Sequence, residues 1–224
     1  MKLKKLLPVP AVLIILASCS LTPYGGGEPE LQQPEEPSVI EEESTLYEEI
    51  GEGEKYVFET NDTRYLTEAG YTIWTTKHVN ESDFFETVSV TMSKESGRSE
   101  AGYGIVFCSQ EIEEKPFLIT VLINTRGMYA VGKVVDGVYS HINGGWKSPK
   151  GIKGGYGINN EISVSYDGKE KSFLLKINGY DITTFTVQED IKFKGSRWGY
   201  VAVIAANEDF PKNPVKVTFE KEDQ

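Results

Sequence analysis

Hydrophobic and polar residues alternate with a period of two along much of this chain. Val88, Val90 and Met92 fall on one side of one such run. The same alternation recurs in residues 172–177 and in residues 215–220. This pattern predicts half-buried antiparallel strands, with the apolar side chains turned toward a core.

Two further runs, residues 117–123 and 200–206, are apolar at almost every position. They predict central strands that are covered on both faces. The glycine-rich segment 151–157 predicts a flexible loop. Hairpin turns with positive φ favour Asn-Gly and Asp-Gly dipeptides, and these occur at residues 136–137, 167–168 and 178–179.

The short strands predict a single all-β domain over residues 55–224. No helical periodicity persists beyond a few residues, although Thr45–Ile50 could form a short turn. Ten or more short runs with turn signals every 8–12 residues are typical of an antiparallel β-sandwich or jelly roll. The 170 residues of this segment suit one domain.

The N-terminus has a different pattern. Three lysines precede an apolar run over residues 6–16, which contains two prolines and is shorter than the roughly 20 residues of a membrane-spanning helix. The run ends in Leu16-Ala17-Ser18-Cys19, which resembles the lipobox of bacterial lipoproteins. The resemblance implies a signal peptide at residues 1–18 and a lipid anchor on Cys19.

Such an anchor implies a bacterial cell-envelope protein, held at a membrane through its N-terminal lipid. By the same resemblance, Ser20 after the cysteine permits sorting to the outer membrane or cell surface. Removal of residues 1–18 would shift the formal net charge from −11 to −14.

Most of this negative charge belongs to residues 19–54, which hold eleven Glu and no Lys, Arg or Asp. Like charges and prolines predict a disordered, extended tether. Residues 55–224 carry 23 acidic and 20 basic side chains. Because no basic stripe or high pI is present, the composition speaks against nucleic-acid binding.

Few residues suit redox or metal chemistry. Cys108 lies in the apolar run Tyr-Gly-Ile-Val-Phe-Cys, so we expect a small buried hydrophobe there rather than a nucleophile. His78 and His141 are far apart in the sequence, and zinc needs three or four ligands. We therefore expect no metal and no cofactor.

An ordered set of motifs resembles the concanavalin A-like lectin/glucanase superfamily, in particular its laminin-G-like bacterial domains. The resemblance spans roughly residues 84–220 and implies a jelly-roll sandwich; fold alone does not imply function. One glycine of the family pattern is replaced here by Ala202. The matching segments are residues 101–107, 117–123, 127–131, 146–148, 160–164, 173–179 and 195–201, followed by the terminal strand.

Glycoside hydrolases need two carboxylates about 5–10 Å apart across the bond that they cleave. The predicted strands offer isolated residues, Glu86 and Glu161, while Glu111 and Glu113 lie at an expected exposed turn. The Glu-x-Asp-x-Glu pattern of the glucanase members is missing, so the sequence favours a non-catalytic protein.

A cluster of aromatic residues suggests a shallow binding site for a glycan or peptide. Tyr139, His141, Trp146 and Tyr156 fall in one loop-rich stretch, with Asn143 among them. Alternatively, Trp146 caps the core and the tyrosines lie singly on the surface.

The sequence therefore predicts a lipid-anchored, non-catalytic envelope module for binding or adhesion, with carbohydrate as its candidate ligand. Two alternatives stay open: a glycoside hydrolase with carboxylates from separate strands, and a structural envelope protein that docks an envelope or host protein.

Overall fold

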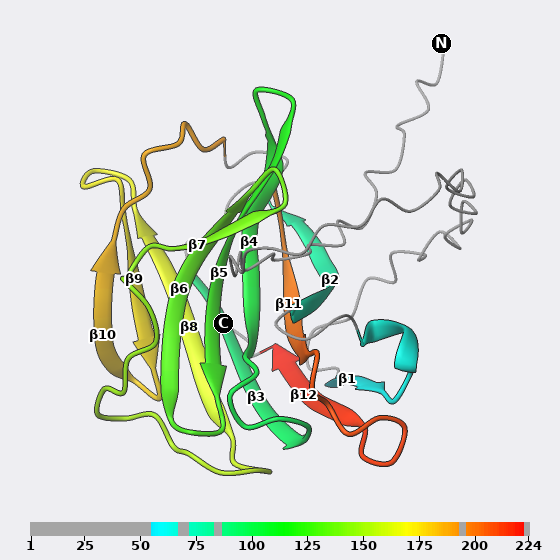
Figure 1. Cartoon of the computed structure of the whole chain (residues 1–224). Coiled ribbons are helices and arrows are strands. Elements are labelled where there is room, and N and C mark those ends of the chain that lie inside the picture. The colour runs from blue at the N-terminus through cyan, green and yellow to red at the C-terminus, as the bar shows by residue number, and fades with distance from the viewer. Residues whose placement is uncertain (1–54, 67–71, 83–86, 193–195, 222–224) are drawn as a thin grey trace, which may run out of the picture.

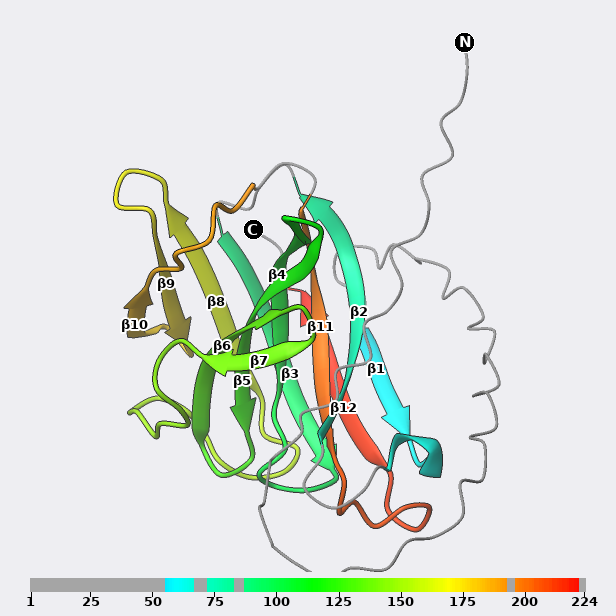
Figure 2. The same ribbon diagram turned by 45° about the horizontal axis from the view of Figure 1, so that its top comes forward.

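The described residues of this computed structural model are 55–66, 72–82, 87–192 and 196–221, and they form two packed antiparallel β-sheets (Figures 1 and 2). The predicted all-β antiparallel sandwich is thereby confirmed. Sheet A has the order β1 (Lys55–Thr60), β12 (Val215–Lys221), β3 (Thr87–Ser96), β8 (Asn160–Asp167), β9 (Ser172–Ile177) and β10 (Tyr180–Phe185).

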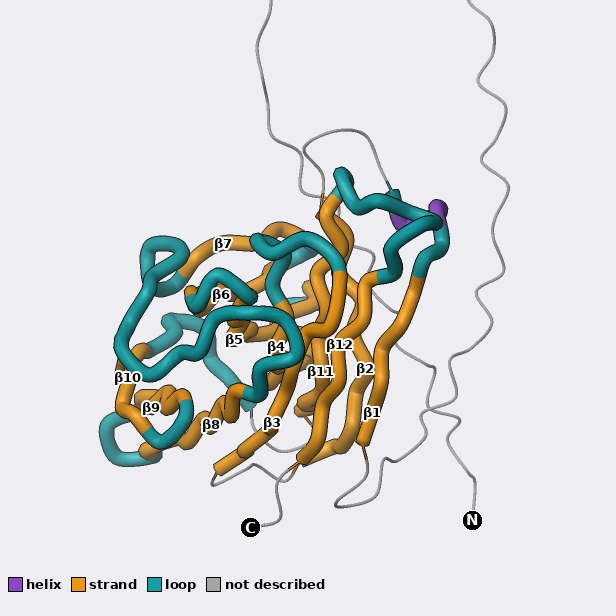
Figure 3. The backbone as a smooth tube through the Cα atoms, turned by 90° about the horizontal axis from the view of Figure 1, so that it is seen from below, coloured by secondary structure: helices purple, strands orange, loops and turns teal. Residues whose placement is uncertain are grey.

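Sheet B covers the other side of the core, and the two layers are seen from one end in Figure 3. A short 3-10 turn, η1 (Thr63–Tyr65), follows β1. The order of sheet B is β2 (Thr72–Ser82), β11 (Ser196–Ala205), β4 (Tyr103–Ile112), β5 (Lys115–Asn124), β6 (Met128–Val135) and β7 (Val138–His141).

The main core lies between the sheets and is built by the alternation seen in the sequence. Val88, Val90 and Met92 of β3 are buried, as are the inward residues of β9 and β12. Trp198 of β11 is also buried in this core. Since period-two burial is found in all three strands, their predicted faces are confirmed.

A second apolar cluster lies on the face of sheet B that is turned away from sheet A. We call it the outer cluster; Leu118, Tyr139, Trp146 and Ala205 pack against it. Because β5 and β11 contribute to both clusters, the prediction that they are central and covered on both faces is confirmed. The outer cluster consists of Ala101, Val106, Leu122, Val201 and Val203.

Two of the three predicted hairpin turns have the expected backbone. Asp136 and Gly137, like Asn178 and Gly179, adopt positive φ at both positions. The turn between β8 and β9 differs, because the Asp167 carboxylate accepts hydrogen bonds from the backbone N–H groups of the second and third residues that follow, at 2.8 and 3.2 Å.

Close packing explains one glycine of the family-like motifs. A Cβ atom on Gly104 of β4 would lie 1.9 Å from the carbonyl oxygen of Val121. Ala202, which replaces a glycine of that pattern, is buried in the main core, so a small side chain is accommodated. Glu111 and Glu113 are exposed at the β4–β5 hairpin, as expected.

Several expectations fall outside the described residues: the signal peptide and Cys19, the tether, the turn at Thr45–Ile50, and Glu86. The backbone of His78 lies in β2, but its side chain is not described. Among the described residues, no helix is long and apolar enough to cross a membrane.

Candidate functional site

Tyr139 lies on the β6–β7 hairpin, against the backbone of the neighbouring strand. A Cβ atom on Gly132 of β6 would come within 2.3 Å of the Tyr139 ring, so glycine provides the space that the ring occupies. The register pairs Gly132 with His141, two residues beyond Tyr139. The ring therefore rests on the outer face of sheet B, partly open to solvent.

His141 is an immediate partner of Tyr139. The Tyr139 hydroxyl lies 3.0 Å from His141 Nδ1, and the two rings meet edge to face with centroids 4.9 Å apart. Burial raises the pKa of Tyr139 to about 12, although a hydrogen bond with Thr120 opposes the rise. Desolvation lowers the pKa of His141. Neutral His141 can therefore accept a hydrogen bond at Nδ1 and donate one outward from Nε2.

Trp146 lies on the same face of sheet B as Tyr139. A Cβ atom on Gly102 would lie 3.0 Å from Trp146 Cη2, so the tip of the indole sits close above this glycine. Trp146 is half-buried and, like Tyr139, packs against the outer cluster. The expectation that Trp146 covers apolar residues is therefore met, yet part of its ring remains accessible.

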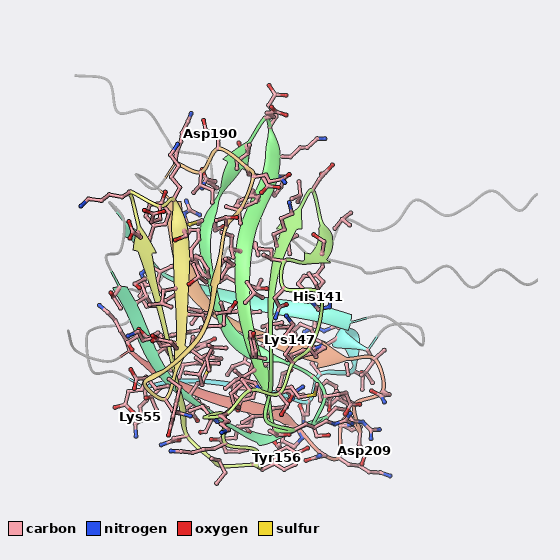
Figure 4. All side chains as sticks on the ribbon, turned by 90° about the vertical axis from the view of Figure 1, so that its left-hand side faces the viewer. Lys55, His141, Lys147, Tyr156, Asp190 and Asp209 are labelled. Atoms are coloured by element: carbon pink, nitrogen blue, oxygen red, sulfur yellow. The ribbon has the colours of Figure 1, made fainter. Side chains whose placement is uncertain are left out.

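Tyr156, the fourth predicted residue, lies elsewhere. Its hydroxyl donates a 2.5 Å hydrogen bond to the carbonyl oxygen of Gly97, in the connection between β3 and β4. Figure 4 shows Tyr156 at the lower end of the molecule, well separated from His141. The structure thus brings Tyr139, His141 and Trp146 to one face of sheet B and places Tyr156 at the end of the sandwich.

Two asparagines that the sequence suggested only as strand and turn residues hold the loop of residues 142–159. Asn160 Oδ1 accepts the backbone N–H of Lys153, and its Nδ2 donates to the Lys153 carbonyl, both at 2.9 Å. Asn178 Nδ2 donates to the carbonyl of Gly151 at 2.7 Å and to Asn160 Oδ1 at 2.8 Å. The predicted flexible loop is therefore tied to β8 and to the β9–β10 hairpin.

Tyr180 is an exposed aromatic residue that the sequence analysis did not select. Its side chain is 58% exposed. A Cβ atom on Gly151 would lie 2.6 Å from the Tyr180 ring, so the ring rests on the loop backbone at this glycine. Its position directly after the Asn178-Gly179 turn is the sequence signal that could have identified it as an exposed aromatic residue.

A buried lysine fixes the end of the sandwich near Tyr156. Lys94 of β3 is fully buried, and its ammonium donates to the carbonyl oxygens of Arg98 and Ala101 at 2.8 and 3.2 Å. Burial lowers the pKa of Lys94 to about 8, and the nearby Glu208 carboxylate opposes this shift. Glu208 in turn accepts the Arg98 backbone N–H with both oxygens.

The described side chains do not form a pair of carboxylates on the face that carries Tyr139. In β4, β5, β6, β7 and β11 the only acidic residue is Glu111, at the β4–β5 hairpin; β2 contains Glu81, whose side chain is not described. Within the described part of the chain, no group of three or more His, Cys, Asp and Glu is placed to hold a metal ion. The face offers aromatic rings and hydrogen-bonding groups.

Neither a protein-family model nor a curated relative matches this chain. Several solved structures are similar to it at low sequence identity. The carbohydrate-binding module CBM66 from Bacillus subtilis matches with 13% identity, a TM-score of 0.42, and coverage of 67% of this chain and 95% of that one.

The β-glucanase of Bacillus licheniformis matches with 9% identity, a TM-score of 0.44, and coverage of 69% of this chain and 71% of the other. Sheep galectin-11 matches with 10% identity, a TM-score of 0.38, and coverage of 58% and 93%. These likenesses concern the β-sandwich fold.

Proposed function

We propose that this protein is a lipid-anchored, non-catalytic module of the bacterial cell envelope that binds carbohydrate on the outer face of sheet B. One observation carries the proposal: Tyr139 and Trp146 present partly accessible rings on the same face, against one apolar cluster. Aromatic rings offer flat apolar surfaces, on which sugar rings stack, and nearby polar groups fix the orientation. His141 supplies such a group beside Tyr139.

The absence of a carboxylate pair among the described residues of this face supports binding without cleavage. Hydrolysis of a glycosidic bond requires an acid and a second carboxylate on opposite sides of that bond. Glu111 lies with Glu113 and Glu114 at the exposed β4–β5 hairpin rather than in the strands beneath Tyr139 and Trp146. Glu161 of β8 belongs to sheet A, where it accepts a 2.6 Å hydrogen bond from Ser89.

The lipid anchor is the second part of the proposal and is supported by the sequence alone. Cys19 follows Leu-Ala-Ser at the end of a short apolar run. We expect Cys19→Ser to release the protein from the membrane fraction, because the variant has no thiol to acylate. Continued fractionation of Cys19→Ser with detergent-extracted membranes would contradict the anchor.

A glycan array tests the binding activity. The full mature chain, solubilised in detergent, is applied beside Trp146→Ala, and the bound oligosaccharides are then checked for cleavage products. We expect selective binding that Trp146→Ala weakens, without cleavage. Binding to no glycan would contradict the proposal, and hydrolysis that depends on one Glu or Asp would establish an enzyme instead.

A further inference from the structure

A second surface lies at the end of the sandwich, where the loop of residues 142–159 runs across the strand ends. After β7 the loop first descends along the edge of β6 and then crosses the lower end of the molecule in Figure 1, on the side that faces the viewer in Figure 3. No acidic residue occurs between Gly137 and Asn160, although the whole chain has a net charge of −11. The same stretch holds three lysines: Lys147, Lys150 and Lys153.

Within the described part of the chain, these lysines take part in no ion pair. All three side chains are exposed. The ion pairs among the described residues use other cations, such as Arg126 with Glu100 and Lys176 with Asp181. Lys147 lies at the start of the loop, where its backbone pairs with Tyr129 of β6, and Figure 4 shows it beside His141 and above Tyr156. Three exposed ammonium groups are thus spread along the loop from the edge of sheet B toward the end of the sandwich.

Two exposed aromatic rings accompany the lysines. Tyr180 rests on Gly151, the residue that follows Lys150, and Tyr156 is 48% exposed three residues beyond Lys153. Asp181 is the acidic residue nearest in sequence to Tyr180, and it is paired with Lys176. The loop and its surroundings therefore combine lysines that have no ion-pair partner among the described residues with flat apolar rings.

Hydrogen bonds hold the loop backbone before any ligand arrives. Gly155 N–H donates to the Thr125 carbonyl at 2.7 Å, and Gly157 N–H donates to the Lys94 carbonyl at 2.9 Å. Asn160 and Asn178 secure the middle of the loop, at Lys153 and Gly151. A preorganised loop loses little conformational entropy on binding, so modest contacts can give useful affinity.

We propose that this end surface binds an anionic polysaccharide whose sugar rings carry carboxylates. Lysine ammonium groups suit carboxylates as mobile point charges, and the exposed tyrosines suit sugar rings. The exposed rings of Tyr156 and Tyr180 favour this ligand over a polyphosphate, which has no sugar ring to stack on them. The surface uses residues other than Tyr139 and Trp146. It is therefore distinct from the outer face of sheet B, which is proposed above to bind carbohydrate.

Calorimetric titration of the full mature chain tests this proposal. The probes are polygalacturonate and its fully methyl-esterified form, which keeps the sugar ring but removes the charge. The variant Lys147→Gln/Lys150→Gln/Lys153→Gln is compared with a control, Lys115→Gln/Lys169→Gln/Lys171→Gln. The control removes the same charge from exposed lysines at the β4–β5 and β8–β9 hairpins, which take part in no ion pair among the described residues.

We expect the wild-type chain to bind polygalacturonate, more weakly at high salt, and to bind the esterified polymer poorly. The loop variant should lose about tenfold in affinity, while the control variant keeps it. Circular dichroism checks that both variants are folded.

Three results would overturn the proposal: no binding of polygalacturonate by the wild-type chain, an equal loss in both triple variants, or equal lysine-dependent binding of single-stranded polynucleotide or anionic vesicles. Trp146→Ala should leave polygalacturonate binding intact. Comparison of Trp146→Ala with the loop variant therefore distinguishes a failure of the end-surface proposal from a failure of the proposed carbohydrate site on sheet B.

Discussion

The side-chain amide of Asn160 binds the backbone of Lys153 at two points. Asn160 Oδ1 accepts a hydrogen bond from the Lys153 N–H, and Asn160 Nδ2 donates one to the Lys153 carbonyl, each at 2.9 Å. Asn160 is 1% exposed, so water cannot readily replace these bonds. Its Oδ1 also accepts from Asn178, which links the loop to the β9–β10 hairpin. One buried amide thus positions a glycine-rich loop on two strands.

Asn160→Ala should lower the free energy of unfolding by about 2–3 kcal/mol, because the partners of the buried amide lose their hydrogen bonds. The loop lysines remain, but their positions are no longer fixed, so polygalacturonate affinity should fall as well. Urea unfolding and calorimetry measure the two effects. Asn159→Ala is the matched control, since Asn159 is exposed; equal behaviour of the two variants would refute the anchoring role.

Gly132→Ala should displace the Tyr139 ring from sheet B. The added Cβ atom would lie 2.3–2.5 Å from the outer atoms of the ring. Because the ring can swing outward, we expect a stability loss of only about 1 kcal/mol but a clear loss of glycan binding. Gly168→Ala provides the control, since its Cβ atom would lie 3.8 Å from Tyr166. Unchanged glycan binding by Gly132→Ala would argue against a role for Tyr139.

Lys94 should make the protein more stable as the pH rises from about 8 to 10. Its pKa in the folded state is lowered to about 8 from an ordinary value of 10.5. The unfolded chain therefore binds more protons in this window, and the free energy of unfolding increases with pH.

The increase between about pH 8 and pH 9.5 should be about 1–2 kcal/mol. Above about pH 10 the trend should reverse, since burial raises the pKa of Tyr200 to about 12 and an unfolded tyrosine ionises earlier. Urea unfolding at several pH values measures this pH dependence of the free energy of unfolding. Lys94→Met should lack the rise; the same slope in Lys94→Met would assign the effect to another group.

The thiol of Cys108 should be inert in the native protein. Cys108 is fully buried in β4, and burial raises the pKa of its thiol, so little thiolate forms. In the Cys19→Ser variant, where Cys108 is the only cysteine, Ellman's reagent should react only after denaturant is added. Rapid reaction without denaturant would show that β4 opens readily.

Limited proteolysis should separate the tether from the sandwich. We expect cleavage within residues 20–54, which hold eleven Glu and few apolar residues. A stable fragment beginning near Lys55 is the expected product, identified by mass spectrometry. Digestion throughout the chain at a similar rate would contradict a single domain over residues 55–224.

The sequence predicts the strands and their buried faces well because alternation is a local property. Val88, Val90 and Met92 show this directly. Lys94 takes the next inward position and is also buried, which alternation alone does not suggest. Its burial depends on the carbonyl oxygens of Arg98 and Ala101 in the connection that follows β3, and the long apolar stem of lysine tolerates the core.

Strand order and the candidate site depend on contacts between distant segments, so they could be predicted only in part. The C-terminal strand β12 lies between β1 and β3, a pairing that no local pattern specifies. The sequence identifies the aromatic stretch from Tyr139 to Tyr156. In the structure these two residues lie apart, because the loop crosses from the outer face of sheet B to the end of the sandwich. Tyr156 therefore lies at the end of the sandwich (Figure 4), away from Tyr139, and Tyr180 rests on Gly151 of the same loop.

A glycan array that compares the full mature chain with Tyr139→Ala and Tyr180→Ala tests the central claim most directly. For uncharged glycans, we predict that the wild-type chain and Tyr180→Ala bind the same ligands, and that Tyr139→Ala weakens this binding by about tenfold while remaining folded. Wild-type binding by Tyr139→Ala, or no binding of any glycan by the wild-type chain, would contradict a carbohydrate-binding face on sheet B.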